Sequence, residues 1–464
     1  MPLPPLTGQQ HHVAYLDAAG HQVIQGTAGS GKTVMAVLRA GYLVRAATPN
    51  HGPALLLTHD NSLVNYLRHL AGGQADAVTV ETYARFARGY LASLGRMGHN
   101  AISGDAAPGY LKEAIAEVRT QFRPNVFFDR PLEFFMDELE WIGGMGIPSL
   151  DDYLNVERAG RKEPLQPGQR RALWRVVEAY ERIRTAGGHT YDWWTLATAV
   201  RSGLATDGRE RVYRHIVVDE AQDFPPEVLR SLAEAIQPGG SLTVFMDQSQ
   251  QIYGQRTSWK AAGLTIAKVH EFSENYRNTP EIAAVAVAMA EMPHFQDTPD
   301  LVLPKTPRRA AGAKPTLYMA STAANELRQV RAQVEQFGRT ARVAVLGRRR
   351  EAARRAVGGI VGARLLSKDM PPWDDSPGVY YGTFYAAKGL EFEMIAVPFA
   401  DASLMPESAA VAAYGVDEAL ARESRLLYVA VTRARTELLI SCSTGTLTSL
   451  LPAQTDPMWA VVTD

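Results

Sequence analysis

Short runs of β-branched and other apolar residues recur along the chain, and most of them precede a stretch with helical spacing. Alternating strands and helices of this kind are typical of parallel, doubly wound sheets. The predicted strands fall into two groups: 23–25, 54–58, 78–80, 216–218 and 242–246, then 316–319, 342–346, 379–383, 394–397 and 437–441. The fold class is therefore predicted to be α/β, with two parallel-sheet lobes.

The segment 88–201 interrupts this rhythm because it is rich in aromatic residues and has the spacing of helices. We interpret it as a helical domain inserted into the first lobe. The predicted organisation is a first lobe made of residues 1–87 and 202–270, the insertion at 88–201, and a second lobe at 271–464.

Composition narrows the class of protein. With 464 residues, of which 46% are hydrophobic and 21% charged, the chain is expected to be globular with several domains. Cys442 is its only cysteine, which excludes an internal disulfide and a Cys-rich zinc site and fits the cytoplasm. Neither a secretory signal nor a membrane span is predicted. A net charge of −1 argues against a protein that coats nucleic acid by bulk charge, but not against one that grips a single strand by stacking.

One segment has the pattern of a phosphate-binding loop, G-x4-G-K-T, between a predicted strand and a predicted helix. Its residues are Gly26, Thr27, Ala28, Gly29, Ser30, Gly31, Lys32 and Thr33. Glycines allow backbone N–H groups to surround phosphates, and the helix N-terminus adds positive potential. Lys32 is predicted to contact the β- and γ-phosphates, and Thr33 to ligate Mg²⁺.

A second segment, 216–220, is an apolar strand that ends in Asp219 and Glu220. Two carboxylates in this position also occur at a solvated helix start. Beside a P-loop they favour catalysis: Asp219 is predicted to hold Mg²⁺, and Glu220 to orient or deprotonate the attacking water.

Further segments resemble the motifs of UvrD/Rep-like superfamily 1 DNA helicases, in that family's order. They are 6–10 (Q-motif), 219–223 (motif II), 247–253 (motif III), 274–277 (motif IV), 383–392 (motif V) and 423–434 (motif VI). The resemblance implies two RecA-like lobes with the helical insertion, called 1B, in the first. The spacing between motifs IV and V leaves little room for the corresponding 2B insertion, which we expect to be absent or minimal.

The resemblance also implies ATP and Mg²⁺ as cofactors and a role for each matching residue. Gln10 would bind the adenine edge, Tyr276 would stack on the base, Glu391 would reach the ribose, Arg39 would lie beside the nucleotide, Gln250 would sense the γ-phosphate, and Arg277 and Arg433 would be arginine fingers from the second lobe. Taken singly, either arginine would more often form a surface salt bridge, and it is the surrounding motifs that favour the role of a finger.

Contacts with a single DNA strand are implied for a third set of residues: Thr58, Asn61, Thr82, Tyr83, Tyr253, Arg256, Arg348, Thr383 and Tyr385. The sequence departs from the family pattern at three points: Gln255 replaces an aromatic residue, Tyr385 replaces a histidine, and His59-Asp60 is atypical. Arg348–Arg350, Arg354 and Arg355 form a basic cluster that a solvated helix start would also explain. Trp193 and Trp194 are interpreted as core residues.

Two functions stay open from the sequence. The first is an ATP-dependent 3′→5′ DNA helicase or translocase that acts on single-stranded DNA, with a 3′-tailed duplex as substrate. The second is a nucleic-acid-stimulated ATPase that serves as a switch or loading subunit without processive unwinding, which the trimmed second lobe favours. In the first case the protein acts alone or with a protein partner, such as a nuclease or a repair or defence subunit, and in the second it belongs to a larger complex.

Overall fold

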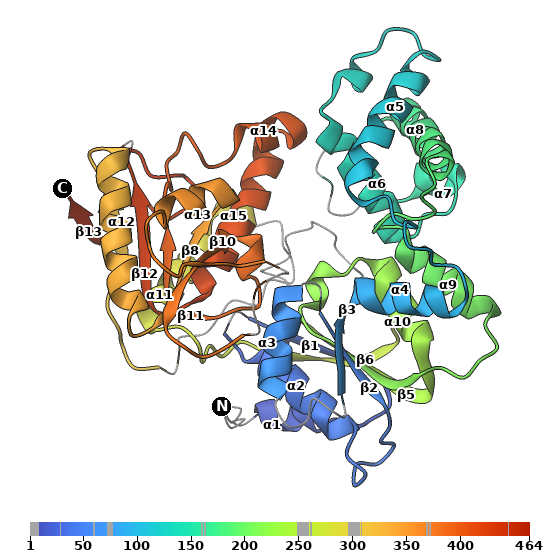
Figure 1. Cartoon of the computed structure of the whole chain (residues 1–464), viewed down its shortest axis with the longest axis horizontal. Helices are drawn as coiled ribbons and strands as arrows, with labels where there is room; N and C mark the ends of the chain where they lie inside the picture. Colours follow the sequence, from blue (N-terminus) through green and yellow to red (C-terminus); the bar gives the residue numbers. More distant parts are fainter. Residues whose placement is uncertain are drawn as a thin grey trace.

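The computed structural model describes most of the chain. The described residues are 9–27, 29–58, 61–71, 78–158, 161, 164–247, 259, 262–295, 307, 309–367, 370, 373–443 and 445–464. They form two sheet-containing lobes and a helical insertion, and in Figure 1 the insertion (α5–α8) rises beside the second lobe and above the first.

The first lobe is built on a six-stranded parallel sheet of order β3-β2-β4-β5-β1-β6. Its strands are β1 (Gly20–Gly26), β2 (Ala54–Thr58), β3 (Val78–Thr82), β4 (Tyr213–Val218), β5 (Ile236–Met246) and β6 (Ile266–Phe272). Alternate strand residues point to opposite faces. Ile216 and Val218 pack into one apolar core and Val217 into the other, so both faces of β4 are covered. Burial on both faces explains the continuous apolar runs in the sequence.

Helices cover both faces of this sheet. They are α1 (Gln9–Ala14), α2 (Lys32–Leu43), α3 (Asn61–Ala71), α4 (Tyr83–Ser93), α9 (Leu196–Thr206) and α10 (Pro226–Ala235). Helix α9 packs on α4 and α10, and its Leu196, Val200 and Leu204 join the core of the sheet. It therefore belongs structurally to the first lobe, although its first residues fall within 88–201.

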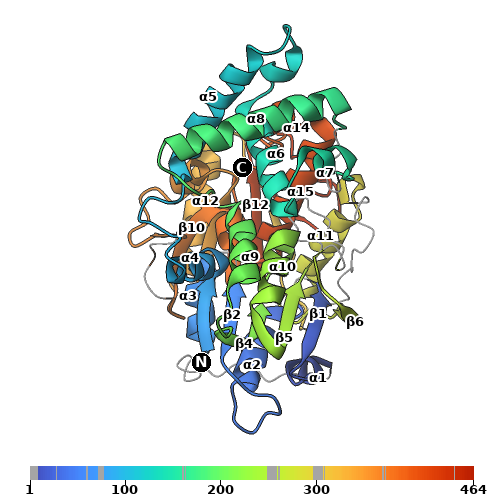
Figure 2. The ribbon, with the colours of Figure 1, turned by 90° about the vertical axis from the view of Figure 1, so that its right-hand side faces the viewer.

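The insertion has a core of its own, formed largely by aromatic and aliphatic residues between Ala107 and Ile183. Its elements are η2 (Gly104–Ala106), α5 (Ala107–Arg119), η3 (Val126–Asp129), α6 (Leu132–Met145), α7 (Leu150–Asn155) and α8 (Pro167–Ala186). Helix α6 contacts α14 of the second lobe, and Figure 2 shows the two helices close together.

The second lobe carries a seven-stranded parallel sheet of order β13-β7-β12-β11-β8-β10-β9. Its strands are β7 (Thr316–Met319), β8 (Arg342–Gly347), β9 (Arg364–Leu365), β10 (Gly378–Thr383), β11 (Phe392–Val397), β12 (Ala434–Cys442) and β13 (Ala460–Thr463). Its helices are α11 (Pro280–Ala290), α12 (Ala323–Gly338), α13 (Arg350–Ala356), α14 (Ser408–Tyr414) and α15 (Val416–Thr432), with short turns at η6 (Pro293–Phe295) and η7 (Tyr385–Ala387).

The predicted fold class, two parallel α/β lobes in a RecA-like arrangement, is confirmed. All ten predicted strands are present, and β6, β9 and β13 are additional. Each additional strand lies at the edge of its sheet, where fewer residues are buried and the apolar pattern is weaker. No helix in the described part of the chain has the length and apolar character needed to cross a membrane.

Candidate nucleotide site at the lobe junction

The predicted phosphate loop joins β1 to α2 and has the backbone that its glycines permit. Gly29 and Gly31 have φ angles of 76° and 84°, in the left-handed region that favours glycine. A side chain at Gly29 would also collide with the carboxamide of Asn275. This glycine therefore serves both the turn of the loop and its close approach to the linker between the lobes.

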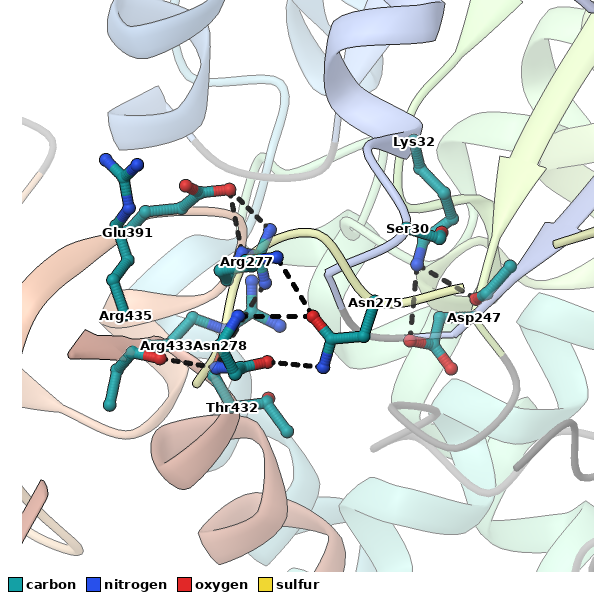
Figure 3. Close-up of polar contacts among 12 residues, drawn as sticks. Ser30, Lys32, Asp247, Asn275, Arg277, Asn278, Glu391, Thr432, Arg433 and Arg435 are labelled. Atoms are coloured by element: carbon teal, nitrogen blue, oxygen red, sulfur yellow. Dashed lines mark hydrogen bonds and ion pairs between the residues drawn. The ribbon is translucent and has the colours of Figure 1, made fainter. Parts of the chain in front are cut away.

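Lys32 lies at the first position of α2 and turns back towards the loop. Its Nζ lies 2.9 Å from the Gly26 carbonyl oxygen, 2.8 Å from that of Thr27, and 3.2 Å from Oδ2 of Asp247 (Figure 3). Asp247 follows β5, and its backbone N–H donates to Oε1 of Gln222 over 2.9 Å. The Gln222 amide in turn donates to Glu220. A continuous polar network thus joins the P-loop lysine to the carboxylate predicted to act on water.

Asp219 directly follows β4, near Lys32 and Thr33 of the P-loop, and is fully buried. Neither of its carboxylate oxygens accepts a hydrogen bond of good geometry. Burial, followed by the charge of Glu220, raises its pKa to about 7, while the nearby Thr33 hydroxyl acts in the opposite direction. A buried carboxylate that accepts no hydrogen bond of good geometry, with a hydroxyl nearby, fits a divalent cation, so Asp219 and Thr33 are suitable Mg²⁺ ligands.

Glu220 follows directly with an unusual backbone. Its φ of 55° and ψ of 42° place a non-glycine residue in the left-handed region, and such strain tends to occur at functional sites. Burial alone would raise the pKa of Glu220, but the charges of Lys388, Arg433 and Lys32 lower it overall. The carboxylate is therefore ionised at neutral pH and can accept a proton.

The linker between the lobes, which follows β6, lies against the P-loop. The backbone N–H of Tyr276 donates to the Gly29 carbonyl over 2.9 Å, and Nδ2 of Asn278 donates to the Thr432 carbonyl over 3.3 Å. Asn275 is almost fully buried between these contacts (Figure 3). A short segment therefore connects the phosphate loop directly to the end of α15 in the second lobe.

The two arginines predicted as fingers meet on the second-lobe side of this junction. Arg277 forms an ion pair with Glu391, with Nε 2.7 Å from Oε1, so the predicted ribose ligand is held by an arginine here. Arg433 caps α15, donates from Nε to the Val429 carbonyl over 3.1 Å, and is almost fully buried. Burial and the charge of Arg277 lower its pKa to about 10, while Glu220, Glu391 and Asp247 oppose this shift. Arg433 thus stays charged, near the Glu220 carboxylate across the junction.

The other residues predicted to contact the nucleotide form hydrogen bonds within the protein. Gln10 Nε2 donates to the Ser30 carbonyl over 2.8 Å, which ties the Q-motif to the P-loop. The hydroxyl of Tyr276 donates to Glu274 over 3.0 Å. Arg39 is buried and its guanidinium donates to the carbonyls of Leu16 and Asp17, so in this structure it holds the turn before β1.

A buried ion pair also spans the lobes. Lys388, in the turn after η7, contacts Asp223 at the end of motif II, and the two side chains are 9% and 2% exposed. Asp223 lies three residues from Glu220, and Lys388 lies three residues from Tyr385. This pair therefore links the acidic segment after β4 to the turn of the second lobe that is predicted to contact DNA.

The residues predicted to contact DNA are divided between surface and core. Tyr385 is 37% exposed, with the Arg348 guanidinium 5.9 Å from its ring centroid. Thr58 is buried at the end of β2, and Thr82 caps α4. Tyr83 is buried, with its hydroxyl 2.7 Å from that of Ser231, so its ring is part of the first-lobe core.

Further expected strand contacts have other environments or lie outside the described part. Thr383 accepts a hydrogen bond from the Ala386 amide over 3.2 Å, and Arg348 pairs with Glu423 over 2.6 Å. Arg350, Arg354 and Arg355 are exposed on α13. The residues Ala28, Gln250, Tyr253, Gln255 and Arg256, the pair His59-Asp60 and the side chain of Asn61 lie outside the described residues.

The interpretation of Trp193 as a core residue is wrong, because its side chain is 50% exposed. Trp194 does pack inward, with its ring stacked near Tyr180. Trp193 borders a cavity of about 480 Å³ whose lining includes Phe224, Gln222 and Asp223. The sequence signal was a tryptophan pair shortly before motif II, but only tertiary packing reveals which of the two faces outward.

Two RecA-like lobes with a phosphate loop and an acidic strand end facing buried arginines define a two-lobe P-loop architecture. Residues 365–445 match the family model of the UvrD-like helicase C-terminal domain, so the resemblance to UvrD-like helicases is confirmed and a helicase is indicated. The match spans the predicted motifs V and VI. No curated protein matches the chain.

Among solved structures, the chain matches the C-terminal domain of a possible DNA helicase from Lactobacillus plantarum WCFS1. The identity is 20%, the match covers 40% of this chain and 98% of that chain, and the TM-score is 0.28. A similarity of this size carries no argument about function, which rests here on the family match and the geometry of the site.

Proposed function

We propose that this protein is an ATP-dependent DNA helicase or translocase that moves 3′→5′ along a single strand, with ATP hydrolysed between the lobes. The observation that carries this proposal is the continuous set of contacts from Lys32 through Asp247 and Gln222 to Glu220, faced across the junction by Arg433. A site divided in this way is complete only when the lobes are together, so hydrolysis and lobe movement are coupled.

Each half of the site has a distinct chemical task. Lys32, Arg277 and Arg433 provide positive charge for the triphosphate, and Glu220 accepts a proton from the attacking water or orients it. Mg²⁺, when bound by Asp219 and Thr33, would neutralise charge on the β- and γ-phosphates. The Arg277–Glu391 pair must rearrange before Arg277 can serve the phosphate, which makes its action dependent on the bound nucleotide.

The DNA strand is proposed to cross both lobes beside the junction, on the side where Trp193 and Tyr385 lie. Trp193 on the first lobe and Tyr385 on the second provide exposed aromatic surfaces, and base stacking tolerates any sequence. The cavity beside Trp193 is lined by Gln222 and Asp223, which also contact Glu220 and Lys388 respectively. Occupation of the strand path can therefore alter the catalytic network directly.

The decisive experiment measures ATP hydrolysis with single-stranded DNA, RNA and duplex, and strand separation on duplexes with 3′ or 5′ tails. We expect strong stimulation by single-stranded DNA and unwinding only of the 3′-tailed duplex. Unwinding of the 5′-tailed duplex alone would contradict the proposed 3′→5′ direction. A rate of ATP hydrolysis that nucleic acid does not change would contradict the proposed motor function.

A switch or loading ATPase is the second candidate. In its favour, the described elements between Pro280 and Thr383 all belong to the sheet of the second lobe or to its covering helices, and Tyr385 replaces the family's histidine. Stimulation by single strands without separation of the 3′-tailed duplex would favour this candidate over the helicase.

A further inference from the structure

The insertion and the second lobe are joined by a forked ion pair. Nη2 of Arg422 on α15 lies 3.2 Å from Oδ2 of Asp137 on α6, and Nη1 lies 3.4 Å from Oδ1. Helix α6 also contacts α14 beside this pair, as Figure 2 shows. Since α6 and α15 belong to different bodies, the contact is a bridge between them.

Both partners of the bridge are held in place by neighbours. Arg161 also pairs with Asp137, while Arg422 donates to Glu418 over 2.7 Å and its guanidinium lies 4.0 Å from the ring centroid of Tyr414. Burial would raise the pKa of Asp137, but the two arginines lower it overall. A bidentate, partly buried and pre-oriented pair has greater strength than an isolated surface ion pair.

The face of α6 that carries Asp137 also lies along the proposed path of the DNA strand. Asp137, Glu140 and Gly144 follow helical spacing, and the last two border the cavity beside Trp193. On the other side, Tyr385 lies close enough to Arg422 and Asp137 for their charges to act on its hydroxyl, although burial contributes most to its raised pKa. Helix α6 thus extends from the aromatic site of the first lobe towards that of the second.

We propose that α6, held by the Asp137–Arg422 bridge, closes the strand path into a ring, so that the substrate is a single strand threaded from a free end. The ring consists of the first lobe, the insertion continuous with it, the bridge, and the second lobe, which returns to the first through Lys388 and Asp223. This inference rests on the proposed function, because it specifies the topology of the strand that the motor accepts.

The test locks the bridge and varies the topology of the DNA. In the full chain, Asp137→Cys and Arg422→Cys are joined with a short bis-maleimide. The natural Cys442 is buried, and burial chiefly raises the pKa of its thiol to about 12, so it should not react. ATP hydrolysis is then measured with linear and with circular single-stranded DNA, before and after cross-linking.

We expect the unlinked variant to be stimulated by both DNAs, and the linked one to keep stimulation by linear DNA but lose it with circular DNA. Cross-linking after loading should leave the protein on circular DNA through a high-salt wash. Equal stimulation of the linked protein by both DNAs, or none by either, would overturn the closed ring. Absence of stimulation in the unlinked protein would instead refute the proposed function.

A second variant needs no cross-link. Arg422→Ala should open the bridge, speed dissociation from linear DNA and leave hydrolysis without DNA unchanged. The matched control is Arg339→Ala, at an exposed arginine whose described ion pair is to Glu335 in the turn before it. Dissociation as slow as that of the control would contradict a retaining role for the bridge.

Discussion

The candidate nucleotide site and the proposed path of the DNA strand lie next to each other but are built differently. Asp219, Glu220 and Arg433 are almost completely buried, and the charge of Glu220 acts on both of the others. Trp193 and Tyr385 are half or one-third exposed and stand on separate lobes. One site is a dense electrostatic network, and the other is a set of separate surfaces.

This difference agrees with what each site is proposed to recognise. A triphosphate requires fixed charges in fixed positions, and buried charges are tolerated only when partners compensate them. A motor must accept every base, so stacking surfaces suffice and many arrangements are equivalent. We therefore expect single changes in the nucleotide site to have much larger effects than single changes in the strand path.

Arg433→Ala should have the largest effect. Loss of an arginine finger lowers the rate of phosphoryl transfer by about 10³–10⁵, and ATP affinity should change much less because the arginine acts mainly on the transition state. Hydrolysis and nucleotide binding are measured separately, with Arg339→Ala as control. Equal losses in rate and affinity would show that Arg433 is a ground-state ligand.

Glu220→Gln should have the second-largest effect. Turnover should fall by about 10²–10⁴, because the proton acceptor is lost while the size of the side chain is kept. Nucleotide binding should persist, since the amide can still accept a hydrogen bond from Gln222. Glu210→Gln, at an exposed glutamate of the same lobe, is the control. Near-normal hydrolysis in the Glu220 variant would remove this residue from the chemistry.

The Lys388–Asp223 pair tests whether the two regions communicate. Lys388→Met leaves a buried carboxylate without its lysine partner, a change that costs about 3–5 kcal/mol in comparable buried pairs. DNA-stimulated hydrolysis should fall more than the basal rate, because the pair joins the lobes between the two sites. In a double-mutant cycle, adding Asp223→Asn should cost little more; strictly additive losses would mean that the contact is not coupled.

The sequence predicted which residues gather at the candidate nucleotide site better than it predicted the exposure of residues along the proposed DNA path, for the same reason. Phosphate binding needs a glycine turn, a lysine and a carboxylate strand end at fixed spacing, and all are visible as motifs. The network through Gln222 was not predicted, because it depends on the register of β4 against β5. The edge strands β6, β9 and β13 were missed because their apolar patterns are short or interrupted.

The environment of an aromatic residue was least predictable. Tyr83 was expected beside DNA, yet its hydroxyl meets Ser231, a residue 148 positions away on α10. Trp193 was expected in the core, yet the fold leaves it beside a cavity. An aromatic side chain suits either a core or a DNA-binding surface. Only the packing of α4, α10 and the insertion decides which of these environments each of the two residues occupies.

Trp193→Ala should have the smallest effect of the set and would sharpen the comparison most. An exposed stacking contact contributes about 1 kcal/mol, at the lower end of the range for a base on an aromatic ring, which is about a fivefold loss of affinity for single-stranded DNA. Hydrolysis without DNA should be unchanged, and Trp193→Phe should restore most of the binding. If Trp193→Ala lowered basal hydrolysis as strongly as DNA affinity, the cavity residues Gln222 and Asp223 would have to be counted with the nucleotide site, and the division between a network and separate surfaces would no longer hold.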